Sequence, residues 1–113
     1  MNDCLFCKII DGEIPSTKVY EDELCYAFND ISPMAPTHIL IIPKKHYKDI
    51  SEINDENSSI VAHIFEVANK IAKEKNLDGG YRIVTNCGTD AGQTVFHLHF
   101  HLLGGEKLSV QLA

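Results

Sequence analysis

In the middle of this 113-residue chain, an apolar residue recurs every three or four positions. The recurring residues are Ile60, Ile64, Val67 and Ile71. Such spacing places them on one face of an α-helix, so the pattern predicts one long helix. We expect Asn54 to cap its N-terminus, with Asp55 and Glu56 in its first turn. Asn76 and the Gly79-Gly80 pair are expected to end the helix.

Shorter apolar runs predict a second helix and several strands. The first dozen residues place four apolar side chains at helical spacing before Gly12: Leu5, Phe6, Ile9 and Ile10. Runs rich in β-branched and aromatic residues, bounded by turn-forming residues, predict strands over 19–20, 24–28, 38–42 and 81–85.

Segment 95–103 has a period of two, because apolar residues alternate with histidines. Successive side chains of a strand point to opposite faces, so one face should carry Phe96, Leu98, Phe100 and Leu102 into the core. The other face should carry a row of His97, His99 and His101. Because strands and helices do not alternate regularly, we expect an α+β fold with a mainly antiparallel five-stranded sheet, one long and one short helix, in a single domain over residues 1–113.

Charge and composition exclude several classes of function. With 10 Lys and Arg against 16 Asp and Glu, the net charge is −6, so we expect no nucleic-acid-binding surface. No apolar stretch approaches the ~20 residues that cross a bilayer, and Asp3 argues against an export signal. We therefore expect a cytoplasmic protein that binds no membrane. In that reducing compartment, Cys4-x-x-Cys7 indicates metal or redox chemistry, while Cys25 and Cys87 are expected to be free thiols.

The histidine row allows three interpretations from the residues alone. The first is a half-exposed strand face that tolerates histidine. The second is a metal site, since histidines of the row can join Cys4, Cys7 and His46 on one ion. The third is phosphoryl or nucleotidyl transfer, in which a neutral imidazole attacks phosphorus. For that chemistry, the loop before the strand offers hydrogen-bond donors from Gly88, Gly92, Gln93 and Thr94. His63, on the flank of the long helix, is expected to be structural.

Segment His97-Leu98-His99-Phe100-His101-Leu102-Leu103 resembles the signature of the histidine triad family. Four further segments resemble the branch called histidine triad nucleotide-binding proteins: FNDISP at 28–33, APTH at 35–38, IPKKH at 42–46 and GQTV at 92–95. The resemblance extends from Cys4 to Gly105. It implies an α+β fold in which two subunits of a homodimer share an extended antiparallel sheet. Members of this branch cleave purine nucleoside phosphoramidates or acyl-adenylates.

The resemblance also implies which residues act on the phosphate. His99 would be the nucleophile, forming a covalent nucleotidyl-histidine that water then hydrolyses. His101 and His38 would contact the α-phosphate. Asn86 and Thr94 would donate to its oxygens, with Thr94 placed to help protonate the leaving group.

Other residues would bind the remainder of a purine nucleotide, such as an AMP or GMP conjugate. By the same resemblance, Gly92 and Gln93 would shape the phosphate loop, and Asp30 would hold the ribose hydroxyls. The base pocket would be lined by Phe6, Ile9, Ile14, Phe28 and Ile31.

The Cys4-x-x-Cys7 pair resembles the subset of the family that binds zinc. The ligands here would be Cys4, Cys7, His46 and His97. Four protein ligands make a closed structural site, so one zinc ion per chain would tie the N-terminal helix to the sheet. It would take no part in catalysis, and no catalytic metal is expected.

We therefore expect a purine nucleoside phosphoramidate or nucleoside-phosphate hydrolase. One alternative is cleavage of dinucleoside polyphosphates, a reaction of a sister branch that shares the 92–95 loop. Another is a nucleotide-binding or zinc-binding partner protein without turnover.

Overall fold

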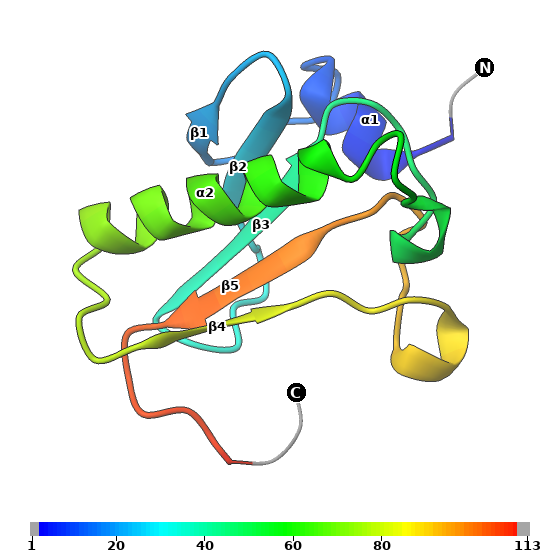
Figure 1. The fold of residues 1–113 in the computed structure, drawn as a ribbon. Coiled ribbons are helices and arrows are strands. Elements are labelled where there is room, and N and C mark those ends of the chain that lie inside the picture. Colours follow the sequence, from blue (N-terminus) through cyan, green and yellow to red (C-terminus); the bar gives the residue numbers. More distant parts are fainter. Residues whose placement is uncertain (1–2, 111–113) are drawn as a thin grey trace.

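A five-stranded antiparallel sheet runs through the protein, whose computed structural model describes residues 3–110 (Figure 1). The predicted domain includes residues 1–2 and 111–113, which lie outside the described part. The strands are β1 (Lys18–Glu21), β2 (Cys25–Asn29), β3 (Thr37–Pro43), β4 (Tyr81–Val84) and β5 (Phe100–Gly104). Their order in the sheet is β1-β2-β3-β5-β4.

Two α-helices of unequal length accompany the sheet within residues 3–110: α1 (Leu5–Ile10) and α2 (Ser59–Glu74). Two short 3-10 helices, η1 (Ile50–Glu52) and η2 (Thr89–Ala91), lie in the connections. The predicted α+β fold with one long and one short helix is confirmed. The sharing of the sheet between two subunits stays a prediction. No helix within the described residues has both the length and the apolar character needed to cross a membrane.

Each face of the sheet packs against a different helix, because side chains alternate along the strands. Helix α2, which lies across the strands in Figure 1, covers one face. The core on this side comprises Cys25, Ala27, Ile39, Ile41, Ile64, Val67, Ala68, Ile71, Leu98, Phe100 and Leu102. A smaller cluster joins α1 to the other face of β2 and β3, through Phe6, Ile9, Tyr26, Phe28, Leu40 and Ile42.

Helix α2 begins at Ser59, so the prediction that Asn54 caps it is wrong. Oδ1 of Asn54 accepts a hydrogen bond from the backbone N–H of Glu56 (2.9 Å). In turn, the backbone N–H of Asn54 donates to Oδ1 of Asn57 (2.7 Å). Such local bonds compete with helix formation and hold this segment in a turn. The predicted end of the helix is confirmed, because Asn76 adopts a left-handed conformation with φ of 59°.

Strand β5 begins at Phe100, whereas the alternation predicted a strand from residue 95. The backbone before it bonds to a loop, since the N–H of Leu98 donates to the carbonyl of Tyr47 (2.7 Å). The alternation itself persists: the buried members are Leu98, Phe100 and Leu102. The expectation for Phe96 is wrong, because its side chain is 40% exposed. It lies where the chain has left the sheet and the core.

His63 ties α2 to the turn between β1 and β2, as expected of a structural residue. Its Nε2 lies 2.7 Å from Oδ2 of Asp22. Cys25 is buried and Cys87 is exposed, and both are free thiols as predicted.

Candidate functional site

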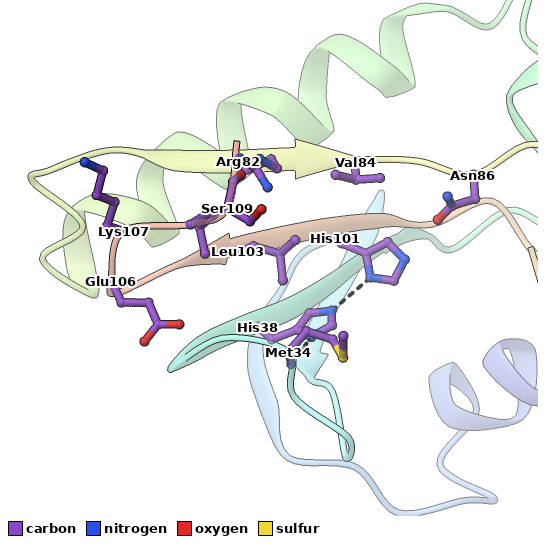
Figure 2. A pocket seen from close by; sticks show the side chains of 11 residues that line it. Met34, His38, Arg82, Val84, Asn86, His101, Leu103, Glu106, Lys107 and Ser109 are labelled. Atoms are coloured by element: carbon purple, nitrogen blue, oxygen red, sulfur yellow. Dashed lines mark hydrogen bonds between the residues drawn. The ribbon is translucent and has the colours of Figure 1, made fainter. Parts of the chain in front are cut away.

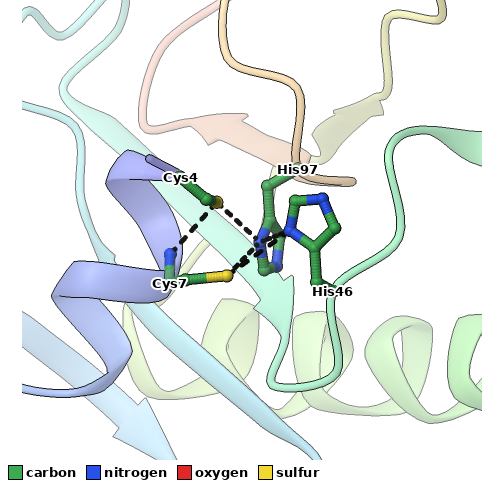
Figure 3. A group of neighbouring side chains, drawn as sticks. All are labelled: Cys4, Cys7, His46 and His97. Carbon is green, nitrogen blue, oxygen red and sulfur yellow. Dashed lines mark hydrogen bonds between the residues drawn. The ribbon is translucent and has the colours of Figure 1, made fainter. Parts of the chain in front are cut away.

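Histidines 97, 99 and 101 divide between two neighbouring clusters. The side chains of His97 and His99 are only 0% and 7% exposed, so the half-exposed face of the first interpretation is excluded for them. His101 stacks between two rings, with ring centroids 5.2 Å from those of both His38 and His99. His97 instead joins a group of potential metal ligands (Figure 3): Cys4, Cys7 and His46.

This metal-ligand cluster has four side-chain atoms within 4.8 Å of one another. The Sγ of Cys4 lies 3.2 Å from Nδ1 of His97, and the Sγ of Cys7 lies 3.4 Å from Nδ1 of His46. The two Nδ1 atoms are 3.1 Å apart. Tetrahedral zinc with ordinary Zn–S and Zn–N bonds separates its ligand atoms by about 3.3–3.8 Å. The cluster is therefore a possible metal-binding group that fits zinc after shifts of a few tenths of an ångström.

Local structure turns these ligands toward one another. Cys4 is the N-cap of α1, and its Sγ accepts a hydrogen bond from the backbone N–H of Cys7 (3.3 Å). The three-residue spacing brings both thiols to one side of the first turn. His97 donates from Nε2 to the carbonyl of Pro43 (2.8 Å), which leaves the lone pair on Nδ1 facing the cluster. Burial lowers the pKa of His97 to about 4, so its imidazole is neutral.

His99 presents an unprotonated nitrogen. Its Nδ1 lies 2.7 Å from the carbonyl oxygen of His97. A carbonyl only accepts hydrogen bonds, so Nδ1 carries the proton and Nε2 carries the lone pair. Burial lowers the pKa of His99, which favours the neutral ring. The ring of Phe6 packs edge-on against it, with centroids 5.1 Å apart.

A hydrogen-bond chain fixes the protonation of His101. The backbone N–H of Met34 donates to Nδ1 of His38 (3.0 Å), so neutral His38 carries its proton on Nε2. That Nε2 donates to Nδ1 of His101 (2.9 Å), which leaves Nε2 of neutral His101 as a donor. Burial lowers the pKa of both rings, that of His101 to about 4. A nucleophilic nitrogen and an N–H donor thus belong to adjacent rings.

Asp30 lies at the edge of this histidine group. Its Oδ2 is 3.5 Å from Nε2 of His38, and its Oδ1 accepts a hydrogen bond from the backbone N–H of Ser32 (2.7 Å). Four of the five predicted base-pocket residues, Phe6, Ile9, Ile14 and Phe28, belong to the cluster around α1. The fifth, Ile31, stands apart and is 98% exposed.

Gln93 organises the loop before β5 from within. Its side chain is 3% exposed, and its Oε1 accepts a hydrogen bond from the backbone N–H of Gly88 (2.8 Å). Its Nε2 donates to the carbonyls of Lys48 (2.8 Å) and Val95 (3.1 Å). These bonds direct the amide toward the backbone, so Gln93 shapes the loop.

The rest of this loop brings further polar groups toward the histidines. Gly92 has a φ of 89°, a left-handed conformation that favours glycine. Nδ2 of Asn86 donates to the carbonyl of Ala91 (2.8 Å), and the Asn86 side chain lies in the same pocket as His101. Thr94 is exposed at the end of the loop.

A pocket of about 430 Å³ adjoins His38 and His101 on the face away from α2 (Figure 2). It is also lined by Met34, Val84 and Leu103, and by Arg82 farther along β4. Sequence reasoning missed Met34 and Arg82. Met34 acts through its backbone, which no side-chain pattern reveals, and Arg82 reaches the pocket only through the pairing of β4 with β5.

Fold and site together define a histidine-centred α+β protein, in which one strand and the residues before it supply both a metal-ligand cluster and a nucleophile-donor pair. The family model described as HIT domain matches residues 11–108, and the chain belongs to this family.

Similar proteins span nearly the same length. An uncharacterized HIT-like protein of Synechococcus elongatus is 48% identical over 107 residues, covering 95% of this chain and 94% of that protein. A HIT family hydrolase from Clostridium thermocellum is 51% identical, with a TM-score of 0.96 over 100% of this chain and 99% of that one. A histidine triad protein from Clostridium difficile is 57% identical, with a TM-score of 0.95 over 99% and 98% of the two chains.

Proposed function

We propose that this protein hydrolyses purine nucleoside phosphoramidates, or closely related nucleoside phosphates, through a covalent intermediate on His99. The observation that carries the proposal is the hydrogen bond from Nδ1 of His99 to the carbonyl of His97. It directs the lone pair of Nε2 away from the backbone, in a ring that burial keeps neutral. The resemblance to histidine triad nucleotide-binding proteins and the similarity to a HIT family hydrolase support the same reaction class.

In the first step, Nε2 of His99 attacks phosphorus and the bond from phosphorus to the leaving nitrogen breaks. The leaving nitrogen takes up a proton, which the hydroxyl of Thr94 relays from water. The imidazole becomes positively charged while it carries the nucleotidyl group, and the carbonyl of His97 stabilises that charge through Nδ1–H.

In the second step, water attacks phosphorus, loses a proton and releases His99 as a neutral ring with a nucleoside monophosphate. Negative charge on the phosphate oxygens is stabilised in both steps by the Nε2–H of His101 and by the amide of Asn86. Asp30 holds the ribose hydroxyls, and Phe6 and Phe28 contact the base.

We also propose that the metal-ligand cluster holds a structural zinc ion. Four protein ligands leave no position for substrate, and the bond from His97 to Pro43 orients one ligand ring. When bound, zinc would cross-link α1 to the loop after β3 and to the segment before β5. The edge strand β4 would extend the sheet into that of a second copy, giving a homodimer.

Steady-state hydrolysis of an adenosine phosphoramidate by wild type and His99→Ala tests the reaction. We expect turnover by the wild type and a loss of at least about 10³-fold in kcat for the variant. His99→Ala should still bind AMP, which shows that the site is intact. A folded wild type that cleaves only diadenosine polyphosphate would replace the proposed substrate class, and binding without any turnover would indicate a partner protein.

A further inference from the structure

Arg82 shares a face of the sheet with the histidines of the proposed reaction. In the strand register, Leu103 of β5 pairs with His38 on one side and with Arg82 on the other. His101 pairs in the same way with Val84. Directly paired residues point to the same face, so these five side chains form two adjoining rows (Figure 2).

Arg82 is within the reach of a small ligand held by His101. The two residues are diagonal neighbours on adjacent strands, and such pairs have Cα atoms about 7–8 Å apart. A long side chain crosses much of that separation. A phosphate at His101 and a second anionic group two or three bonds farther away therefore match the spacing of this site.

The pocket also separates the two substituents of a bound phosphorus. The aromatic residues proposed for the base lie on the α1 side, where Phe6 contacts His99. The pocket extends the other way, toward β4, over an apolar floor of Val84 and Leu103. The group displaced from phosphorus would occupy this side.

The charge of Arg82 is available to a ligand. One guanidinium nitrogen donates to the carbonyl of Ser109 (2.6 Å), which holds the side chain without neutralising it. Glu106 and Lys107 line the same pocket with opposite charges, so Arg82 determines the sign of the site. A guanidinium has five N–H donors and pairs well with a carboxylate.

We infer that Arg82 binds a carboxylate on the leaving group, and that the preferred substrates are nucleoside phosphoramidates of amino acids. This rests on the proposed function. The phosphorus–nitrogen bond breaks as the bond to Nε2 of His99 forms, and the protonated amino acid leaves with its carboxylate on Arg82. Arg82 touches only the leaving group, so it determines specificity and takes no part in bond breaking.

Two adenosine phosphoramidates test the inference, one made with glycine and one with the isosteric, uncharged glycinamide. For wild type we expect kcat/KM to favour the glycine conjugate by about 10-fold or more. Arg82→Met should bring the ratio close to 1, and Arg82→Lys should restore part of it. Lys107→Met, a matched loss of charge at the rim, should keep the ratio. Because each ratio is measured within one protein, partial loss of folding does not change it.

Equilibrium binding gives a readout that needs no turnover. In the His99→Ala background, the glycine conjugate should bind about 10-fold more tightly than the glycinamide conjugate, and adding Arg82→Met should abolish the difference. Equal affinities in the His99→Ala protein, or a preference that survives Arg82→Met, would overturn the inference. Absence of turnover on both conjugates by wild type would instead count against the proposed function, while the binding comparison still decides the role of Arg82.

Discussion

Nε2 of His38 lies 2.9 Å from Nδ1 of His101, and it is the contact that sets which nitrogen of His101 carries the proton. Removing the donor allows the proton of His101 to move to Nδ1, where it no longer faces the phosphate. We expect His38→Ala to lower kcat/KM by about 10–100-fold and to populate both tautomers of His101, as measured by ¹⁵N NMR. His38→Gln, whose amide can donate near the position of Nε2, should recover part of both. An unchanged His101 tautomer in His38→Ala would contradict this assignment.

Removal of the metal should weaken nucleotide binding as well as stability. Cys4 and Cys7 flank Phe6 in sequence, and Phe6 contacts both His99 and Phe28. Metal analysis should find about one zinc per chain in wild type and in the control Cys87→Ser, but little in Cys7→Ser. Calorimetry should show AMP binding weakened several-fold in Cys7→Ser alone. Zinc content and affinity equal to wild type in Cys7→Ser would contradict the proposed centre.

Asp22 should make stability depend on pH in the acid range. Burial opposes its ionisation, but hydrogen bonds outweigh burial and hold the pKa of Asp22 well below its usual range; the donors are Leu24, Cys25, His63 and Tyr20. Because the pKa is lower in the folded state, the stabilisation is complete above the usual pKa of about 3.9 and is lost as the pH falls toward the folded value.

Asp22→Asn tests this effect directly. We expect it to lower the free energy of unfolding by about 1–3 kcal/mol at pH 7, with a difference from wild type that shrinks below about pH 4. Urea titrations at a series of pH values measure the difference. Asp78→Asn, which alters an exposed carboxylate, serves as the control. A difference that stays constant down to pH 2 would show that the charge of Asp22 has no role.

Gln93 should affect turnover through the loop that it holds. Gln93→Met keeps the length of the side chain but removes hydrogen bonds to Gly88, Lys48 and Val95. We expect a loss of about 1–3 kcal/mol in unfolding free energy, since buried backbone groups lose their partners, and a lower kcat. Asp90→Asn in the exposed part of the same loop should behave like wild type. A stable Gln93→Met protein with normal kcat would contradict this role.

Sequence periodicity predicted the elements that bury one face. Helix α2 and the alternation of Leu98, Phe100 and Leu102 follow from burial, which acts on every turn or every second residue. The boundaries depend on local hydrogen bonds that periodicity does not contain. Asn54 forms a turn with its own neighbours, and Leu98 bonds to Tyr47 of a distant loop, so both elements begin later than predicted.

The candidate site was predictable where motifs carry it and not where geometry alone does. Spacing indicated Cys4, Cys7 and the histidines of 97–101, whose ligand and ring groups are now seen to converge. The contact of Met34 with His38 involves a backbone N–H, and the place of Arg82 depends on the register of β4. Ile31 resembles the family at its position, yet it stands away from the other base-pocket residues without a ligand to cover it.

Strand β5 encodes the core and the chemistry in one continuous stretch. Phe100 and Leu102 pack toward α2 while His101 faces the pocket, because the strand repeats every two residues. Inserting or deleting one residue within this stretch would exchange the two faces, placing imidazoles in the core and apolar side chains in the site. Variation in this protein is therefore confined here to substitutions, and changes of length must fall in the loops on either side.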